Sequence, residues 1–178
     1  MKKTAITFII LALTMAVLAL ASFNIASARA GSNYSIQDVN HSVSVLSNGY
    51  VLINDTIAIS GQTDSFLLGF PHTFGPSVIK AIAYSTNDTS NMFPVELNVP
   101  LEDRVGFYGV KVDFPGVTPQ VFSVAFVLSN NLLLQNADNS FTLVFPAFPS
   151  LTETTSVCNC SVVIPGAEYL NGTISSFT

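Results

Sequence analysis

The chain has 178 residues, of which 49% are hydrophobic and only 10% are charged, and its formal net charge is −5. This length corresponds to about one domain. An acidic chain repels the phosphate backbone of DNA and RNA, so the composition argues against nucleic-acid binding.

The first thirty residues have the organisation of a secretory signal. Lys2 and Lys3 precede an apolar run over residues 5–23, and the Ala28, Arg29, Ala30 triplet is a small-x-small cleavage site. The alternative is an uncleaved membrane anchor, since the run is close to the roughly 20 residues that span a bilayer. We expect an extracytoplasmic chain, secreted or membrane-associated, in which three basic residues remain beside eleven acidic ones and the net charge is −8.

Residues 35–70 predict three short strands joined by two turns. In the first strand, residues 35–46, the inward face is expected to hold Val39, His41, Val43 and Val45. Asn48 and Gly49 then favour a type I′ hairpin turn. In the second strand, residues 50–60, a period of two brings together Val51, Ile53, Ile57 and Ile59. Asn54 falls on the opposite, outward face.

Further strands are expected at 65–70, 78–86, 93–99, 105–114, 120–129, 132–135, 141–145 and 154–164. A rigid loop at 71–76 and a polar tip at 87–91 interrupt them. Residues 120–129 are apolar on both faces, as in a central strand of a packed sandwich. Turn signals recur every 8–12 residues or so, which is typical of all-β sandwiches. We therefore predict an all-β, two-sheet antiparallel β-sandwich over residues 31–165, after an N-terminal signal helix at 1–30. Residues 166–178 would be a tail or the start of a further segment.

Six acceptor triplets for N-glycosylation occur in the sequence, about twice the number that chance gives. Their asparagines are Asn33, Asn40, Asn54, Asn87, Asn159 and Asn171. Together with the secretory signal, they predict attached N-glycans. The alternative is a set of asparagine-rich loops in an organism that lacks the pathway.

Cys158 and Cys160 are the two cysteines of the chain. A disulfide across a single intervening residue would form a small, strained ring. The simplest interpretation is that both are small, half-buried strand residues. Pairing with a second chain or with a further segment is the main alternative, and two thiols do not complete a zinc site.

No catalytic constellation or cofactor motif is found in the sequence. His41 and His72 are its two histidines, and either could meet a cysteine in space, but no local motif supports a catalytic triad. We therefore expect a protein that is not an enzyme and holds no cofactor or metal. The segment around Phe145 and Phe148 is a candidate exposed binding surface, because its prolines favour an irregular edge.

The order of features is similar to that of a known family. A TDSFLLG run at 63–69 is followed by an apolar strand at 78–84, a V-x-L-x-V-P-L strand and turn at 95–101, an apolar strand at 122–128 and an aromatic-proline segment before a last strand at 141–164. Over about residues 35–165 this resembles the N-terminal lumenal β-sandwich of ribophorin I, an accessory subunit of oligosaccharyltransferase, and its archaeal relatives. The resemblance implies a non-catalytic module, so no active-site residue carries over.

Two functions are compatible with these features. The first is an extracytoplasmic binding or scaffolding module with a protein partner at the outer membrane face, such as a ribophorin-like accessory domain in protein N-glycosylation. The second is a cell-surface adhesin or surface-layer domain that assembles laterally.

Overall fold

A computed structural model describes residues 33–102, 104–166, 168 and 172 of the chain. The expected signal at 1–30, the acceptor Asn171 and most of the expected tail lie outside these residues. Within them, no helix is long and apolar enough to cross a membrane.

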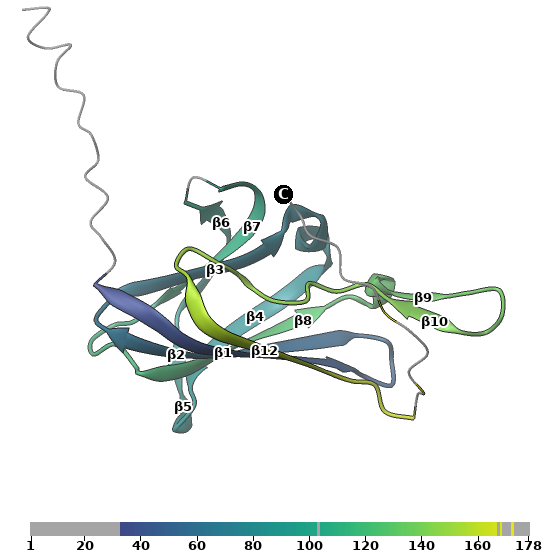
Figure 1. The fold of residues 1–178 in the computed structure, drawn as a ribbon, viewed down its shortest axis with the longest axis horizontal. Helices are drawn as coiled ribbons and strands as arrows, with labels where there is room; N and C mark the ends of the chain where they lie inside the picture. The colour runs from purple at the N-terminus through teal and green to yellow at the C-terminus, as the bar shows by residue number, and fades with distance from the viewer. Residues whose placement is uncertain (1–32, 103, 167, 169–171, 173–178) are drawn as a thin grey trace, which may run out of the picture. The chain divides into compact units, whose positions relative to one another are not determined.

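The described chain is all-β, with two main sheets that confirm the predicted sandwich (Figure 1). The strands are β1 (Tyr34–Val45), β2 (Val51–Gly61), β3 (Ser65–Pro71), β4 (Val78–Ser85), β5 (Asp88–Phe93), β6 (Val95–Leu101), β7 (Arg104–Asp113), β8 (Val121–Leu128), β9 (Leu133–Gln135), β10 (Phe141–Leu143), β11 (Ser150–Leu151) and β12 (Thr155–Val163). Two short 3-10 helices, η1 (His72–Ser77) and η2 (Asn130–Leu132), join them.

The larger sheet has the strand order β12-β1-β2-β8-β4-β5, and the smaller has the order β11-β3-β7-β6. Strands β9 and β10 form a separate hairpin. Neighbouring strands are antiparallel except for β1 and β12, which pair in parallel. β8 lies between β2 and β4, as its two apolar faces predict.

The core lies between the facing surfaces of the two sheets. Phe66 and Phe70 of β3 meet Phe122 and Phe126 of β8 edge to face, with ring centroids 5.1 and 4.8 Å apart. Each such aromatic pair adds about 0.5–1.5 kcal/mol beyond the burial of its area. The predicted inward residues of β1 and β2 are all buried, namely Val39, His41, Val43, Val45, Val51, Ile53, Ile57 and Ile59.

The β1–β2 hairpin is confirmed, but its turn differs from the expected type I′. Gly49 has a φ of +83°, whereas Asn48 has no positive φ. The Gly49 amide donates to the Leu46 carbonyl over 2.9 Å, and the Leu46 amide donates to the Tyr50 carbonyl over 2.8 Å. A three-residue loop ending in a left-handed glycine has this pattern. One left-handed residue is therefore enough to close the hairpin.

Two other local predictions were wrong. The loop at 71–76 is mostly the helix η1, and most of the polar tip at 87–91 belongs to strand β5. Residues 88–92 of β5 are all exposed at the edge of the larger sheet, so they have no apolar alternation to reveal them. β5 is a strand because it pairs with β4, although its sequence shows no strand pattern.

Candidate functional site

A buried polar pair, His41 with Asp55, is the one ion pair in the described core. The two residues stand directly opposite each other on β1 and β2, on the face that meets the smaller sheet. His41 Nδ1 and Asp55 Oδ1 are 2.5 Å apart, and both side chains are fully buried. Both side chains occupy inward positions on faces that are otherwise apolar. On β1, for example, Val39 and Val43 flank His41 in the period-two pattern.

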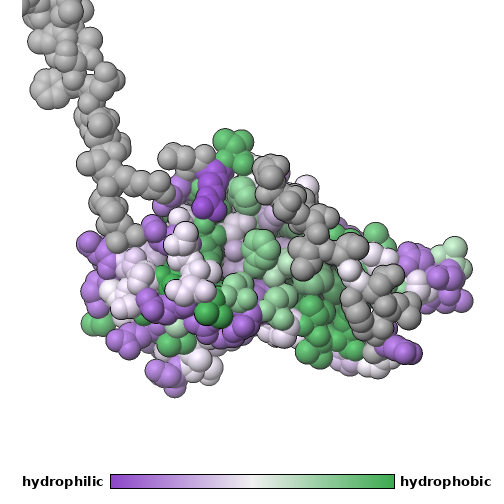
Figure 2. Space-filling view, in the orientation of Figure 1, coloured by the Kyte–Doolittle hydropathy of each residue, from purple (hydrophilic) through white to green (hydrophobic). Residues whose placement is uncertain are grey.

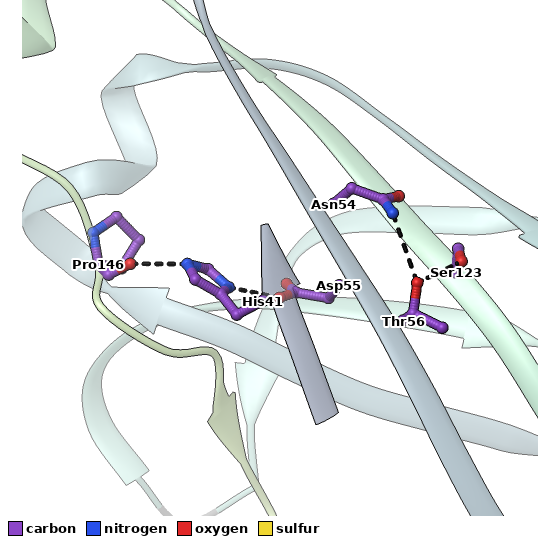
Figure 3. Close-up of polar contacts among 6 residues, drawn as sticks. All are labelled: His41, Asn54, Asp55, Thr56, Ser123 and Pro146. Carbon is purple, nitrogen blue, oxygen red and sulfur yellow. Dashed lines mark hydrogen bonds and ion pairs between the residues drawn. The ribbon is translucent and has the colours of Figure 1, made fainter. Parts of the chain in front are cut away.

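The second ring nitrogen of His41 is bound as well. His41 Nε2 lies 2.9 Å from the carbonyl oxygen of Pro146, in the segment between β10 and β11 (Figure 3). A carbonyl oxygen can only accept, so Nε2 must carry a proton and donate it. This bond fastens the 144–149 segment to the inner face of the larger sheet.

The fixed Nε2 proton restricts the states that the pair can adopt. Either His41 is an imidazolium facing an Asp55 carboxylate, or a neutral imidazole accepts a proton from a protonated Asp55. Both states place one proton between Nδ1 and Oδ1, and both are neutral overall. Burial raises the pKa of the Asp55 carboxyl, while the hydrogen bond and charge of His41 oppose the rise. In the described residues Asp55 Oδ2 has no hydrogen-bond partner.

The cysteines continue the same row across the sheet. Strand register places Cys160 beside His41 and Cys158 beside Val39, both on β12 at the sheet edge. Both thiols are free and exposed. Partial burial raises the pKa of each, and the negative charge of Asp55 adds to the rise. Structure thus brings together a Cys, His and Asp that the sequence left apart, whereas His72 is exposed at the start of η1.

The row does not have the chemistry of a cysteine nucleophile and its base. A catalytic histidine needs a free ring nitrogen to take the proton of the nucleophile, and His41 Nε2 is committed to Pro146. Catalytic cysteines also have lowered pKa values, opposite in direction to these. The arrangement can act as an internal clamp that joins β1, β2 and the 144–149 segment. Among the described residues, no cluster of three or more His, Cys, Asp or Glu could hold a metal ion.

A hollow on the outer face of the larger sheet is the second candidate site. It has a volume of about 410 Å³ and opens between β2, β8 and β4. Its lining is mainly apolar, with three polar groups, and comprises Leu52, Ile53, Asn54, Lys80, Ile82, Tyr84, Ala125, Phe126 and Val127. The Tyr84 hydroxyl donates to Asn54 Oδ1 over 3.1 Å. Figure 3 shows Asn54, Thr56 and Ser123 on the side of β2 opposite to the buried pair.

The predicted glycosylation sites differ in accessibility. Asn33, Asn40, Asn87 and Asn159 are exposed. Asn54 points outward as expected, but it is half buried in the hollow and bonded to Tyr84. A glycan on Asn54 would therefore occupy the hollow itself.

The aromatic-proline segment is exposed in part. Phe148 is 57% exposed, whereas Phe145 is half buried and packs against the core. The cause is the His41 bond to Pro146, which holds the chain next to Phe145 against the sheet. Phe148 is the member of this segment that remains open to a partner.

The chain matches no protein-family model and no curated protein. Solved structures with some likeness include yeast LTA4 hydrolase in complex with bestatin, with a TM-score of 0.44 and 9% identity over 75% of this chain and 23% of that one. A putative protease from Parabacteroides distasonis gives 0.37 and 12%, over 76% and 29%. An M1 zinc metallopeptidase from Deinococcus radiodurans gives 0.34 and 10%, over 68% and 25%. The chain spans about a quarter of these structures, and values this low assign it neither a family nor an activity.

Proposed function

We propose that this chain is a non-catalytic, extracytoplasmic module that binds a protein partner at the outer membrane face, comparable to a ribophorin-like accessory domain in protein N-glycosylation. The proposal rests on the environment of His41, which belongs to the only row of Cys, His and Asp side chains in the described residues. His41 is buried with both ring nitrogens bonded, so it offers no base to a substrate.

The hollow on the outer face of the larger sheet is the surface proposed to meet this partner. Its floor is apolar, and its polar groups, Asn54, Lys80 and Tyr84, can fix the orientation of a bound segment. Lys80 is one of three basic residues beyond residue 30, so the hollow carries positive charge on an acidic chain. An apolar partner segment with an acidic side chain would match it.

Recovery of partners from native membranes tests this proposal. The chain is used as bait and the recovered material is scored for glycosyltransferase subunits. Ile82→Glu places a charge in the hollow, while Ile79→Glu changes an equally apolar side chain that is 53% exposed on the same strand and outside the hollow. We expect Ile82→Glu to lose the partner and Ile79→Glu to keep it.

Three results would overturn the proposal. The first is equal recovery with both variants, and the second is recovery of no glycosyltransferase subunit. The third is a hydrolase or transferase activity of the purified chain that disappears in Cys160→Ala.

A second candidate function, lateral assembly in a surface layer or adhesin, is favoured by the β12 edge. Residues 154–166 carry no charged side chain, although exposed edge strands are usually protected by charge, proline or a bulge. Sedimentation over a range of protein concentrations tests it, and growth beyond a dimer is the expected result. A species that stays monomeric or dimeric at all concentrations would overturn the array.

A further inference from the structure

Strand β12 is an unprotected edge of the larger sheet. It pairs with β1 on one side, and no strand of the described residues pairs with its other side. All its residues after Thr155 are exposed, and Val162 and Val163 are 42% and 53% exposed. Figure 2 shows apolar surface on this side of the molecule, around the C-terminal half of β12. Such an edge is a template for pairing with another strand.

The cysteine spacing excludes a disulfide within the strand. Cys158 and Cys160 point to the same face of β12, where residues two apart have Cβ atoms about 6.6 Å from each other. A disulfide needs Cβ atoms about 3.5–4.5 Å apart. A disulfide of either cysteine therefore requires a partner from another strand.

The same spacing is complementary to itself. If β12 pairs with β12 of a second copy in antiparallel fashion about a two-fold axis at Asn159, each Cys158 stands opposite Cys160 of the other copy. Opposed residues in antiparallel strands have Cα atoms about 4.5–5.5 Å apart, inside the range of about 4.4–6.8 Å that disulfides span. In this register Val162 and Val163 of each copy face Ser156 and Thr155 of the other. No charge is brought into the pairing.

We propose that the chain forms a two-fold dimer through antiparallel β12–β12 pairing, closed by two Cys158–Cys160 disulfides between the copies. The inference uses the edge that favours the second candidate function and names a second copy as its occupant. A two-fold contact closes on itself, so growth beyond the dimer would need a further surface of the chain.

Disulfide formation needs an oxidant, for which a small-molecule disulfide suffices. The thiolate of Cys158 attacks one sulfur of that disulfide, giving a mixed disulfide and releasing one thiolate. The thiolate of Cys160 from the other copy then attacks the cysteine sulfur of the mixed disulfide. The interchain bond forms and the second small thiolate leaves, so each bond consumes two protein thiols and converts one small disulfide into two thiols.

A glycan on Asn159 and the dimer exclude each other. Asn159 lies on the outer face next to Asn40, to which its amide donates over 3.1 Å. Because the two-fold axis passes through Asn159, this residue would lie opposite Asn159 of the other copy at the spacing of paired strands. Two branched glycans cannot stand that close, so the test requires protein from a host without N-glycosylation.

Serine variants of the full chain, incubated with oxidised glutathione, test the register. In Cys158→Ser alone, the remaining Cys160 faces a serine of the other copy, and the same holds in reverse for Cys160→Ser. We expect neither variant to form a covalent dimer on a non-reducing gel. A mixture of the two variants regains one disulfide, and peptide mapping assigns it to Cys158 and Cys160.

The outcomes separate the register from non-specific oxidation. Single variants that cross-link alone as well as in the mixture, or a disulfide between the two cysteines of one chain, would overturn the proposal. A charge on the edge provides a second arm: Val162→Asp should lose the wild-type dimer, whereas Val117→Asp, an 86% exposed loop position, should keep it. Equal amounts of dimer in both variants would also overturn the proposed dimer. If the dimer forms but no larger species appears, only the surface-layer function is overturned.

Discussion

Removal of either member of the His41–Asp55 pair should be strongly destabilising, and removal of both together much less so. Asp55→Ala leaves a buried imidazole facing an empty position, and losing one partner of a buried ion pair costs about 3–5 kcal/mol. His41→Ala should cost at least as much, because it also frees the Pro146 carbonyl, whose hydrogen bond contributes about 1 kcal/mol. A typical domain is stable by only about 5–15 kcal/mol, so either variant approaches the limit of folding.

The double variant, His41→Val with Asp55→Val, is the control. It removes both charges together and places β-branched residues at two strand positions. The Pro146 carbonyl then lacks its donor, which costs about 1–3 kcal/mol, well below the sum of the single variants. Urea unfolding followed by far-ultraviolet circular dichroism measures these values, since the chain contains no tryptophan. Single variants that lose less than about 1 kcal/mol, or a double variant that loses their sum, would refute the assignment of a coupled buried pair.

Two further predictions concern stability. Gly109→Ala should cost about 1–3 kcal/mol, since its Cβ would lie 2.4 Å from the Val99 carbonyl oxygen; an unchanged urea midpoint would argue against this close approach. Tyr84→Phe removes the hydrogen bond to Asn54 and should cost about 1 kcal/mol in the same assay; an unchanged urea midpoint would show that this bond does not stabilise the fold.

Much of the fold could be predicted from alternation alone. The inward residues of β1 and β2 follow a period of two because one face of each strand is buried, and the structure places them as expected. The same pattern contained the buried pair, because Asp55 lies between Ile53 and Ile57 on the inward face and His41 lies between Val39 and Val43. His41 was expected on this face, whereas its pairing with Asp55 was not predicted although the pattern carried its signal.

Other features have no local signal. The parallel pairing of β12 with β1 joins residues more than a hundred positions apart, and alternation does not reveal which strands become neighbours. The bond between His41 and Pro146 likewise depends on the path of a loop 105 residues away in sequence. It explains why Phe145 is packed against the core while Phe148, three residues later, is exposed.

Parallel pairing of β1 with β12 also determines how the domain would respond to tension. The register sets Ile36 beside Thr155 and Ser44 beside Val163, so the described chain enters at one end of the strand pair and leaves at the other. A pull on Tyr34 and Val163 acts along the two strands in opposite directions. The hydrogen bonds between them are then sheared together, whereas those of a hairpin pulled at its ends open one after another. The contact between the edge strand β12 and its neighbour β1 would therefore resist such a pull by shear.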